Sequence, residues 1–227
     1  MFHHYPQTQR SEITNHLAEF EKLGYTLVES VIPQEELRSI ERCCSQLDLS
    51  RAGARDLLAL DWCANIARVL REHPTIHAML QNSLTAIQCT LFVKNDKRNW
   101  LVPLHRDLGI PVKNRVESPN WSGWSVKQGT LHAQPPESVL KGLVAVRLHL
   151  EDTGVDNGAL QVVPGSHLLA EDKGKRIFCT APKGGALVMR PLLLHASSKV
   201  RNGTRKVLHF VYGPSQLPDG AEWANPV

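Results

Sequence analysis

The second half of this chain is built of short apolar segments that alternate with turn residues. From residue 85 onward, segments rich in β-branched and aromatic residues are each followed by Gly, Pro, Asn or Asp. The predicted strands cover residues 86–94, 99–105, 142–152, 159–163, 184–191 and 204–213. Many short strands separated by tight turns are typical of a jelly roll, or double-stranded β-helix. A mainly β core is therefore predicted over residues 85–214, with residues 1–84 as its support.

The first 84 residues follow a different pattern, because their apolar residues recur at helical spacing. Ser11 is expected to cap the first helix and Gly24 to end it. Pro33 suits the first turn of a second helix, and Pro74 separates the last two. The predicted helices cover residues 11–24, 33–47, 56–73 and 75–84, and residues 25–30 are a predicted strand. We expect these helices to pack on one face of the β core, which gives an α+β or mainly β fold.

Composition limits the class of protein. With 227 residues and 42% hydrophobic content, residues 1–227 can bury one substantial core, so we interpret them as a single domain. The five cysteines form no CxxC pair, which favours reduced thiols and a cytoplasmic location. The N-terminal residues show no apolar signal core, and no window approaches the roughly 18 apolar residues of a membrane span. A net charge of +4 without a basic stripe argues against nucleic-acid binding.

Four residues carry the chemistry that the sequence suggests. His105 and Asp107 stand at i and i+2 of an extended segment and so share one side of it, while His195 and Arg205 follow far downstream. Two imidazoles and a carboxylate form the facial triad of non-haem Fe(II) sites, which leaves open positions on the metal. Taken singly, an HxD pair arises by chance, a His in an apolar run is usually a packed core residue, and an Arg after a Gly turn is usually solvated. Their joint occurrence favours a metal site.

The segment between the two halves of this set carries a family resemblance. DNGALQVVPGSH, residues 156–167, lies between the HxD pair and His195, and Arg205 follows ten positions later. From about residue 88 to residue 214 the chain resembles the phytanoyl-CoA dioxygenase-like family of Fe(II)/2-oxoglutarate oxygenases. The resemblance implies a cupin-like double-stranded β-helix, Fe(II) bound by His105, Asp107 and His195, and the far carboxylate of 2-oxoglutarate bound by Arg205. It also implies consumption of O2, release of succinate and CO2, and hydroxylation of an unactivated C–H bond in a small-molecule substrate.

Two features refine what the resemblance implies. Related halogenases replace the metal-binding carboxylate with a small residue, whereas Asp107 is present here, so hydroxylation is favoured over halogenation. The last four residues, ANPV, are not a peroxisomal address, which weighs against a fatty-acyl-CoA enzyme of peroxisomes.

Four further residues are predicted to contact the cosubstrate. Arg147 stands among apolar neighbours on a predicted strand and must be paired if it faces the interior, either with 2-oxoglutarate or a substrate carboxylate, or with an acidic side chain. Gln88 and Thr90 share one face of the strand before the HxD segment, where relatives place cosubstrate contacts. Ser197 lies two residues after His195 and could bond a cosubstrate oxygen, although a Ser near a strand end more often caps backbone.

Residues 108–136 follow the HxD pair and contain several Pro and Gly residues. A connection of that length is predicted to be a functional lid. Trp121, Trp124 and His132 within it, together with Arg106, are the predicted substrate contacts. The cations Arg106, Lys113, Arg115 and Lys127 near the expected mouth could favour an acidic substrate, although a solvated surface is the simpler explanation of them.

Two other classes of function stay open. A metal-binding cupin with different chemistry could share the jelly roll, because fold does not fix function. A non-catalytic relative could keep the barrel as an interaction scaffold. The sequence leaves the substrate, the choice among hydroxylation, desaturation and cyclisation, and the oligomeric state open.

Overall fold

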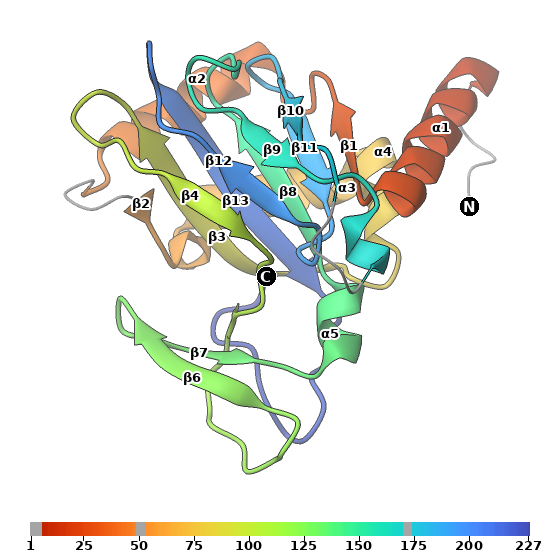
Figure 1. Ribbon diagram of the computed structural model, residues 1–227, viewed down its shortest axis with the longest axis vertical. Coiled ribbons are helices and arrows are strands. Elements are labelled where there is room, and N and C mark those ends of the chain that lie inside the picture. Colours follow the sequence, from red (N-terminus) through yellow and green to blue (C-terminus); the bar gives the residue numbers. More distant parts are fainter. Residues whose placement is uncertain (1–5, 49–52, 170–173) are drawn as a thin grey trace.

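Two antiparallel sheets face each other in the computed structural model, which describes residues 6–48, 53–169 and 174–227 (Figure 1). The larger sheet has the strand order β1 (Tyr25–Val28), β11 (Ala186–Met189), β8 (Val144–His149), β13 (Arg205–Gly213), β3 (Thr85–Lys94) and β2 (Gly53–Ala54). The smaller sheet has the order β10 (Ile177–Cys179), β9 (Leu160–Val162), β12 (His195–Ser197) and β4 (Val102–His105). Neighbours in both sheets come from distant parts of the chain, which is the arrangement of a double-stranded β-helix. The predicted fold class is confirmed.

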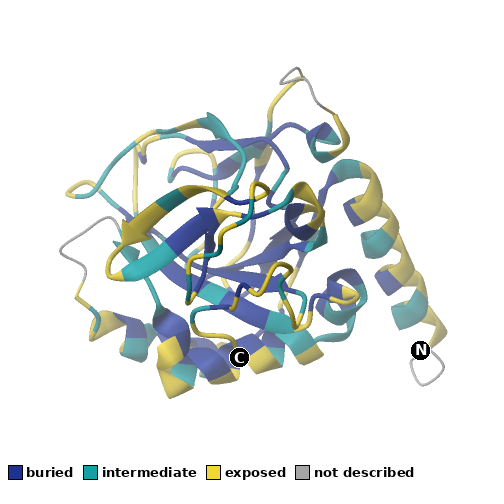
Figure 2. Cartoon of the chain, turned by 90° about the horizontal axis from the view of Figure 1, so that it is seen from below, coloured by how far each residue is buried: buried dark blue, intermediate teal, exposed yellow. Residues whose placement is uncertain are grey.

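The helices cover the outer face of the larger sheet (Figure 1). They are α1 (Gln7–Leu23), α2 (Gln34–Ser45), α3 (Asp61–Glu72) and α4 (Pro74–Leu80), with the short 3-10 turn η1 (Leu57–Ala59) before α3. Alternate residues of β8, namely Val144, Val146 and Leu148, belong to the core that these helices complete. Buried residues concentrate on the central strands, and exposed residues lie mainly on the surrounding helices and loops (Figure 2). In the described part of the chain, no helix combines the length and apolar character needed to cross a bilayer.

The opposite face of the larger sheet points into the barrel. The barrel interior is apolar at one side and polar at the other. Near β9 and β10 the interior is apolar, with Leu187 and Met189 packed on residues of the smaller sheet. Near β3 and β13 it holds buried Arg147, Arg205 and His209. Buried charge is costly unless it is compensated, so this side of the barrel is the place to look for a ligand.

Residues 108–136, predicted to be a lid loop, fold into a small sheet instead. Its strands are β5 (Ile110–Pro111), β7 (Thr130–Gln134) and β6 (Ser122–Lys127), and α5 (Glu137–Gly142) follows it. This third sheet packs on Ile87, Val211 and Trp223 through an apolar cluster of its own. The turn residues that suggested a loop form a tight hairpin at Gln128 and Gly129, which both adopt positive φ.

The start of the first helix also differs from the prediction. Helix α1 begins at Gln7, four residues before Ser11, and Pro6 occupies the position before its first turn. Ser11 lies inside the helix, where its hydroxyl donates to the Gln7 carbonyl oxygen. A hydroxyl can bond the preceding turn of a helix as well as cap one, so Ser11 was a misleading signal. The end of the helix at Gly24 was predicted correctly.

Gly24→Ala is expected to destabilise the fold by about 1–3 kcal/mol. Gly24 has φ +82°, and a Cβ there would clash with the ring of His167 in the short turn η2 (Ser166–Leu168). Thermal denaturation should show the loss as a fall in Tm of about 2–4 °C per kcal/mol. Gly203→Ala is the matched control, because Gly203 has φ +79° but no neighbouring atom within 4 Å of a built Cβ. Equal losses in the two variants would contradict the role given to the His167 contact.

Candidate metal centre

The two histidines of the predicted ligand set meet across a pair of strands. Strands β12 and β4 are antiparallel, and His195 lies directly opposite His105 in their register. The centroids of the two rings are 4.2 Å apart. Just beyond β4, the backbone N–H of Asp107 donates to the carbonyl oxygen of Pro191 at 2.9 Å, which brings the carboxylate back towards the imidazoles. The sheet pairing therefore assembles ligands that are 90 residues apart in the sequence.

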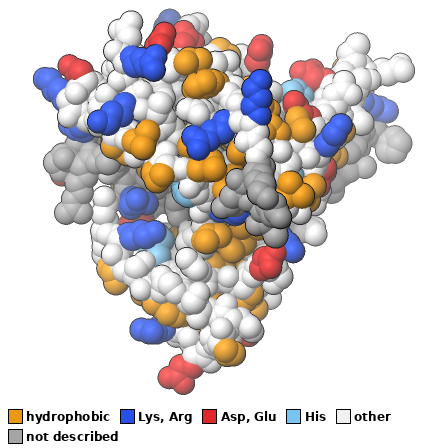
Figure 3. All heavy atoms as spheres, viewed as in Figure 1, with side chains coloured by type: hydrophobic (Ala, Val, Ile, Leu, Met, Phe, Trp, Pro, Cys, Tyr) orange, Lys and Arg blue, Asp and Glu red, His pale blue; other side chains and the backbone are white. Residues whose placement is uncertain are grey.

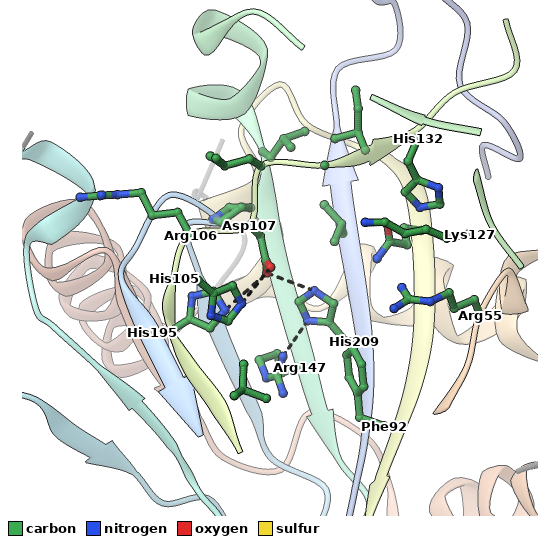
Figure 4. Close-up of a pocket in the computed structure, with 18 of the residues that line it drawn as sticks. Arg55, Phe92, His105, Arg106, Asp107, Lys127, His132, Arg147, His195 and His209 are labelled. Atoms are coloured by element: carbon green, nitrogen blue, oxygen red, sulfur yellow. Dashed lines mark hydrogen bonds and ion pairs between the residues drawn. The ribbon is translucent and has the colours of Figure 1, made fainter. Parts of the chain in front are cut away.

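The donor atoms of these three residues are close enough to share one ion. Asp107 Oδ1 lies 3.5 Å from His105 Nε2, and Asp107 Oδ2 lies 3.6 Å from His195 Nε2. One ligand atom from each residue falls within 4.8 Å of the others. In Figure 4, His105 and His195 point towards the Asp107 carboxylate from the same side.

Both imidazoles are oriented by the same local contact. Nδ1 of His105 bonds the carbonyl oxygen of Pro103 at 2.8 Å, and Nδ1 of His195 bonds that of Leu193 at 2.8 Å. Each contact places the ring proton on Nδ1 and leaves the Nε2 lone pair free to face the centre. This kind of second contact fixes the tautomer of metal-binding histidines.

The electrostatics of His195 and Asp107 suit metal ligands, whereas the hydrogen bond with Asp107 raises the pKa of His105, which would lose that proton to bind a metal. Burial lowers the pKa of His195, which keeps its imidazole neutral. Burial raises the pKa of Asp107, but the hydrogen bond with His105 and the neighbouring imidazoles outweigh it and bring that pKa well below its usual range. A neutral imidazole and an ionised carboxylate are the protonation states that bind a divalent cation.

Buried cations lie next to the three ligands. Arg147 on β8 places Nη1 3.1 Å from His209 Nδ1, and His209 Nε2 lies 3.9 Å from Asp107 Oδ2. Arg205 starts β13 and pairs in register with Lys94, the last residue of β3. An Nη1 of Arg205 donates to the carbonyl oxygen of Gly158. The Nε atoms of Arg147 and Arg205 are buried and have no hydrogen-bond partner among the described residues.

Lys94 strengthens this concentration of positive charge. Its Nζ donates to Ser197 Oγ at 2.8 Å and to the Ser198 carbonyl oxygen at 3.0 Å, and it lies 4.9 Å from the centre of the Trp100 ring. Burial, together with the charges of Arg205 and Arg147, lowers the pKa of Lys94 to about 7. No carboxylate of the described residues forms an ion pair with these three cations. An anion of suitable size would relieve both the repulsion and the missing hydrogen bonds.

The three ligands, together with Arg147, Arg205 and His209, line one cavity of about 460 Å³. Asp107 is the only carboxylate among its described lining residues, against the cations Arg55, Arg106, Lys127, Arg147 and Arg205. The surface view shows Lys, Arg and His side chains around a hollow to the left of centre (Figure 3). The volume is that of a small-molecule site, and the excess of positive charge favours an anionic occupant.

Comparison with known proteins agrees with this geometry. The model of the phytanoyl-CoA dioxygenase (PhyH) family matches residues 20–207. The chain belongs to this family. Its members use Fe(II), 2-oxoglutarate and O2, and the set His105, Asp107 and His195 is the corresponding group that could hold the metal. No curated protein matches the sequence significantly.

The chain is also similar to several solved structures. The 2-oxoglutarate-dependent epimerase SnoN from nogalamycin biosynthesis is 16% identical, with a TM-score of 0.72 over 93% of this chain and 87% of that one. HygX from Streptomyces hygroscopicus, with nickel, 2-oxoglutarate and hygromycin B bound, is 17% identical, with a TM-score of 0.64 over 90% and 88%. AviO1 from Streptomyces viridochromogenes Tue57 is 20% identical, with a TM-score of 0.61 over 90% and 96%. At these identities the likeness concerns the fold.

Most of the predicted cosubstrate residues of this PhyH-family chain reach the cavity. Gln88, Arg147, Ser197 and Arg205 line it, whereas Thr90 is buried beside it without lining it. The pairing of Arg147 with an acidic side chain, one of the two alternatives, is absent from the described residues, because the hydrogen bond that its guanidinium makes is to His209.

The predicted substrate residues divide differently. His132 lines the cavity, whereas Trp121 and Trp124 do not. Trp121 is buried, stacks on Trp124 at 6.1 Å and donates from Nε1 to Asp219 at 3.0 Å. Both rings therefore stabilise the third sheet, as aromatic residues in a small core commonly do. Their positions do not fit the predicted substrate contacts.

Arg106 is also placed differently from the prediction. Its guanidinium donates to the carbonyl oxygens of Leu192, Ser166 and Leu169, and the side chain extends away from Asp107 in Figure 4. Arg106 is among the residues that line the cavity, and its guanidinium anchors the turn at residues 166–169. We interpret Arg106 as a residue that holds the metal-ligand segment in place.

Among the cavity residues that sequence reasoning missed, His209 and Arg55 are the two titratable ones. His209 stands at i+4 from Arg205 on β13, so strand alternation places both on the interior face, and this signal was available. Arg55 had no such signal, because it reaches the cavity only through the pairing of the two-residue strand β2 with β3.

Proposed function

We propose that this chain is a dioxygenase that couples the conversion of 2-oxoglutarate into succinate and CO2 to hydroxylation of an unactivated C–H bond in a small molecule. The observation that carries the proposal is that one cavity is lined both by the metal-ligand set, His105, Asp107 and His195, and by two buried arginines. The arginines, Arg147 and Arg205, have no carboxylate partner among the described residues, and the Nε of each has no hydrogen bond there. A metal centre alone would fit many cupins. A metal centre beside an unsatisfied site for a dicarboxylate fits the family's cosubstrate.

The metal would be held by Nε2 of both histidines, which their Nδ1 contacts orient, and by the ionised Asp107 carboxylate. When bound, Fe(II) supplies activation of O2, and 2-oxoglutarate supplies two electrons as it is oxidised and decarboxylated. Asp107 balances part of the ion's charge. The two neutral imidazoles would add ligands without adding charge, and the three residues together would leave positions on the metal open.

Arg205 would bind the far carboxylate of 2-oxoglutarate. Its guanidinium is a planar fork, and its buried Nε has no partner among the described residues, so a carboxylate would complete its hydrogen bonds. Lys94 and Ser197 lie beside it and would add a charge and a hydroxyl. Arg147 and Gln88 line the same cavity and are proposed as further contacts to the cosubstrate or substrate.

His209 and Phe92 would complete the surroundings of the reaction. Phe92 lines the cavity and lies under the Arg147 guanidinium, 5.8 Å from its ring centre. His209 joins Arg147 to the Asp107 side of the site. Burial lowers the pKa of His209 to about 3, so it acts as a neutral hydrogen-bonding group that orients Arg147 and does not carry a charge.

The alternatives left by the sequence receive less support. A scaffold does not need an ordered set of metal donors beside unpaired buried cations, which cost stability. A cupin of different chemistry does not need Arg205. A cytoplasmic location and a small-molecule substrate stay proposals, and the oligomeric state stays open.

Lys94→Met is expected to stabilise the ligand-free protein by about 1–2 kcal/mol while it weakens 2-oxoglutarate binding. The pKa of Lys94 is about 7 in the folded chain, below its ordinary 10.5. Between these values the unfolded state binds more protons, so the stability of the wild type should rise with pH across this window. Thermal unfolding at several pH values checks the prediction. Lys97→Met, at an exposed lysine, is the control, and parallel stability curves for wild type and Lys94→Met would contradict it.

An isotope experiment separates hydroxylation from other outcomes. The Fe(II)-loaded protein is incubated with 2-oxoglutarate, ¹⁸O-labelled O2 and a panel of small molecules, and succinate release identifies the compounds that stimulate turnover. A hydroxylase places one labelled oxygen atom in the product, which mass spectrometry detects. A product that has lost hydrogen or changed only its stereochemistry, without the label, would replace hydroxylation by cyclisation, desaturation or epimerisation.

A further inference from the structure

The cavity has a second group of basic residues on the wall opposite the metal ligands. Arg55, Lys127 and His132 lie together across the cavity from His105 and His195 in Figure 4. We propose that this group, Arg55, Lys127 and His132, binds an anionic group of the substrate, a carboxylate or a phosphate, and so determines which small molecules the enzyme accepts. This inference rests on the proposed function, because it assigns the opposite wall to the cosubstrate.

The fold holds Arg55 and Lys127 next to each other by specific contacts. The backbone N–H of Arg55 donates to the Gln128 side chain at 3.3 Å, and Thr130 Oγ1 donates to Asp56 Oδ2 at 2.8 Å. These two bonds tie the end of β2 to the tip of the β6–β7 hairpin, more than 70 residues away in the sequence. Asp56 and Gln128 both adopt positive φ, which is rare for residues other than Gly. Such strained positions persist where surrounding contacts determine them.

The side chains of this group are available to a ligand. No ion pair joins Arg55 or Lys127 to a carboxylate within the described ranges. Lys127 reaches over the segment after Asp107, since its Nζ lies 3.6 Å from the place of a Cβ at Gly109. The nearest acid, Asp56, is engaged by Thr130 and does not line the cavity.

His132 adds a directional contact. Its Nδ1 bonds the Thr130 carbonyl oxygen at 3.1 Å, so Nε2 is the ring nitrogen left for a ligand. Burial lowers the pKa of His132, and Lys127 and Arg55 lower it further. An anion between the three residues would reverse that effect by offsetting the two positive charges.

The other cations near the mouth do not share this arrangement. Lys113 pairs with Glu222 at 2.7 Å, Arg115 lies over the Trp124 ring, and Arg106 donates to backbone carbonyls. None of these three directs its charge into the cavity. Lys113, Arg115 and Arg106 are therefore explained as surface or structural cations, and Arg55 and Lys127 are not.

The test measures binding rather than turnover. Protein loaded with Ni(II), which does not turn over, and saturated with 2-oxoglutarate is titrated by calorimetry with n-butyl phosphate, n-butyrate and n-butanol. We expect the anions to bind and the alcohol not to bind, and the stronger of the two anions names the substrate group. The double variant Arg55→Gln/Lys127→Gln should bind that anion about tenfold or more weakly. Its affinity for Ni(II) and 2-oxoglutarate should stay within about twofold of wild type, as expected for charges outside the metal and cosubstrate contacts.

Matched variants make each outcome decisive. Lys113→Gln removes a lysine that follows β5 of the third sheet and does not line the cavity. This variant should bind the anions as wild type does. Equal binding of butanol and the anions by wild type would overturn the inference. So would a large loss of 2-oxoglutarate affinity in the double variant, because the group would then belong to the cosubstrate site. Failure of wild type to bind 2-oxoglutarate at all would instead overturn the proposed function.

Discussion

Asp107→Ala is expected to weaken Fe(II) binding by more than about 100-fold and to abolish succinate formation. Changes to groups that merely support metal ligands already cost about 10- to 100-fold in affinity, and Asp107 is placed as a ligand itself. It is also the one carboxylate among the described residues that line the cavity, whose lining includes the cations Arg55, Lys127, Arg147 and Arg205. Without it, a divalent cation would meet two neutral imidazoles and a strongly positive surrounding field.

Metal affinity can be measured by competition with a chromophoric chelator, on wild type and variant under anaerobic conditions. Asp96→Ala is the matched control, since Asp96 is exposed in a loop and contacts only the neighbouring backbone. Circular dichroism of both variants confirms that the fold is kept. Unchanged metal affinity in Asp107→Ala would remove this carboxylate from the ligand set.

Arg205→Gln is expected to weaken 2-oxoglutarate binding by about 10- to 150-fold while Fe(II) affinity is unchanged. The loss of charge-assisted hydrogen bonds costs about 1.5–3 kcal/mol, and Arg205 is not among the metal donors. The substitution Arg205→Lys keeps the charge but not the planar fork, so its affinity should lie between those of Arg205→Gln and wild type.

Equilibrium dialysis with labelled 2-oxoglutarate gives the cosubstrate affinity of each variant, and competition with the chromophoric chelator gives its Fe(II) affinity. Arg201→Gln, at an exposed turn residue four positions before Arg205, is the control. A parallel fall of metal and cosubstrate affinity in Arg205→Gln would indicate a collapsed site and not a lost contact. Wild-type affinity for 2-oxoglutarate in that variant would place the far carboxylate elsewhere in the cavity.

The parts of the site that sequence could predict are those set by strand alternation. His105 and Asp107 share a side because they are two residues apart, and Arg205 and Arg147 occupy interior positions for the same reason. His209 follows the same rule and was overlooked only because no motif drew attention to it. The fold was equally accessible, since short strands between turn residues have few other solutions.

The parts that sequence could not predict depend on contacts between distant segments. Arg55 enters the cavity because β2 pairs with β3 and because two hydrogen bonds join the end of β2 to the β6–β7 hairpin. Trp121 and Trp124 looked like substrate residues as long as residues 108–136 were treated as a loop, but a folded sheet needs a core and uses them for it. Ser11 suggested a cap where the helix had already begun.

The most direct test of the account is an anaerobic titration of the metal-free protein with Fe(II) and then 2-oxoglutarate, followed by visible absorption. Chelation of the metal by the cosubstrate gives a weak charge-transfer band. The account predicts this band in the wild type, its absence in His195→Ala, and a shift to much higher 2-oxoglutarate concentrations in Arg205→Gln. A wild-type protein that binds Fe(II) but shows no band at saturating 2-oxoglutarate would contradict the account and point to a cupin of different chemistry.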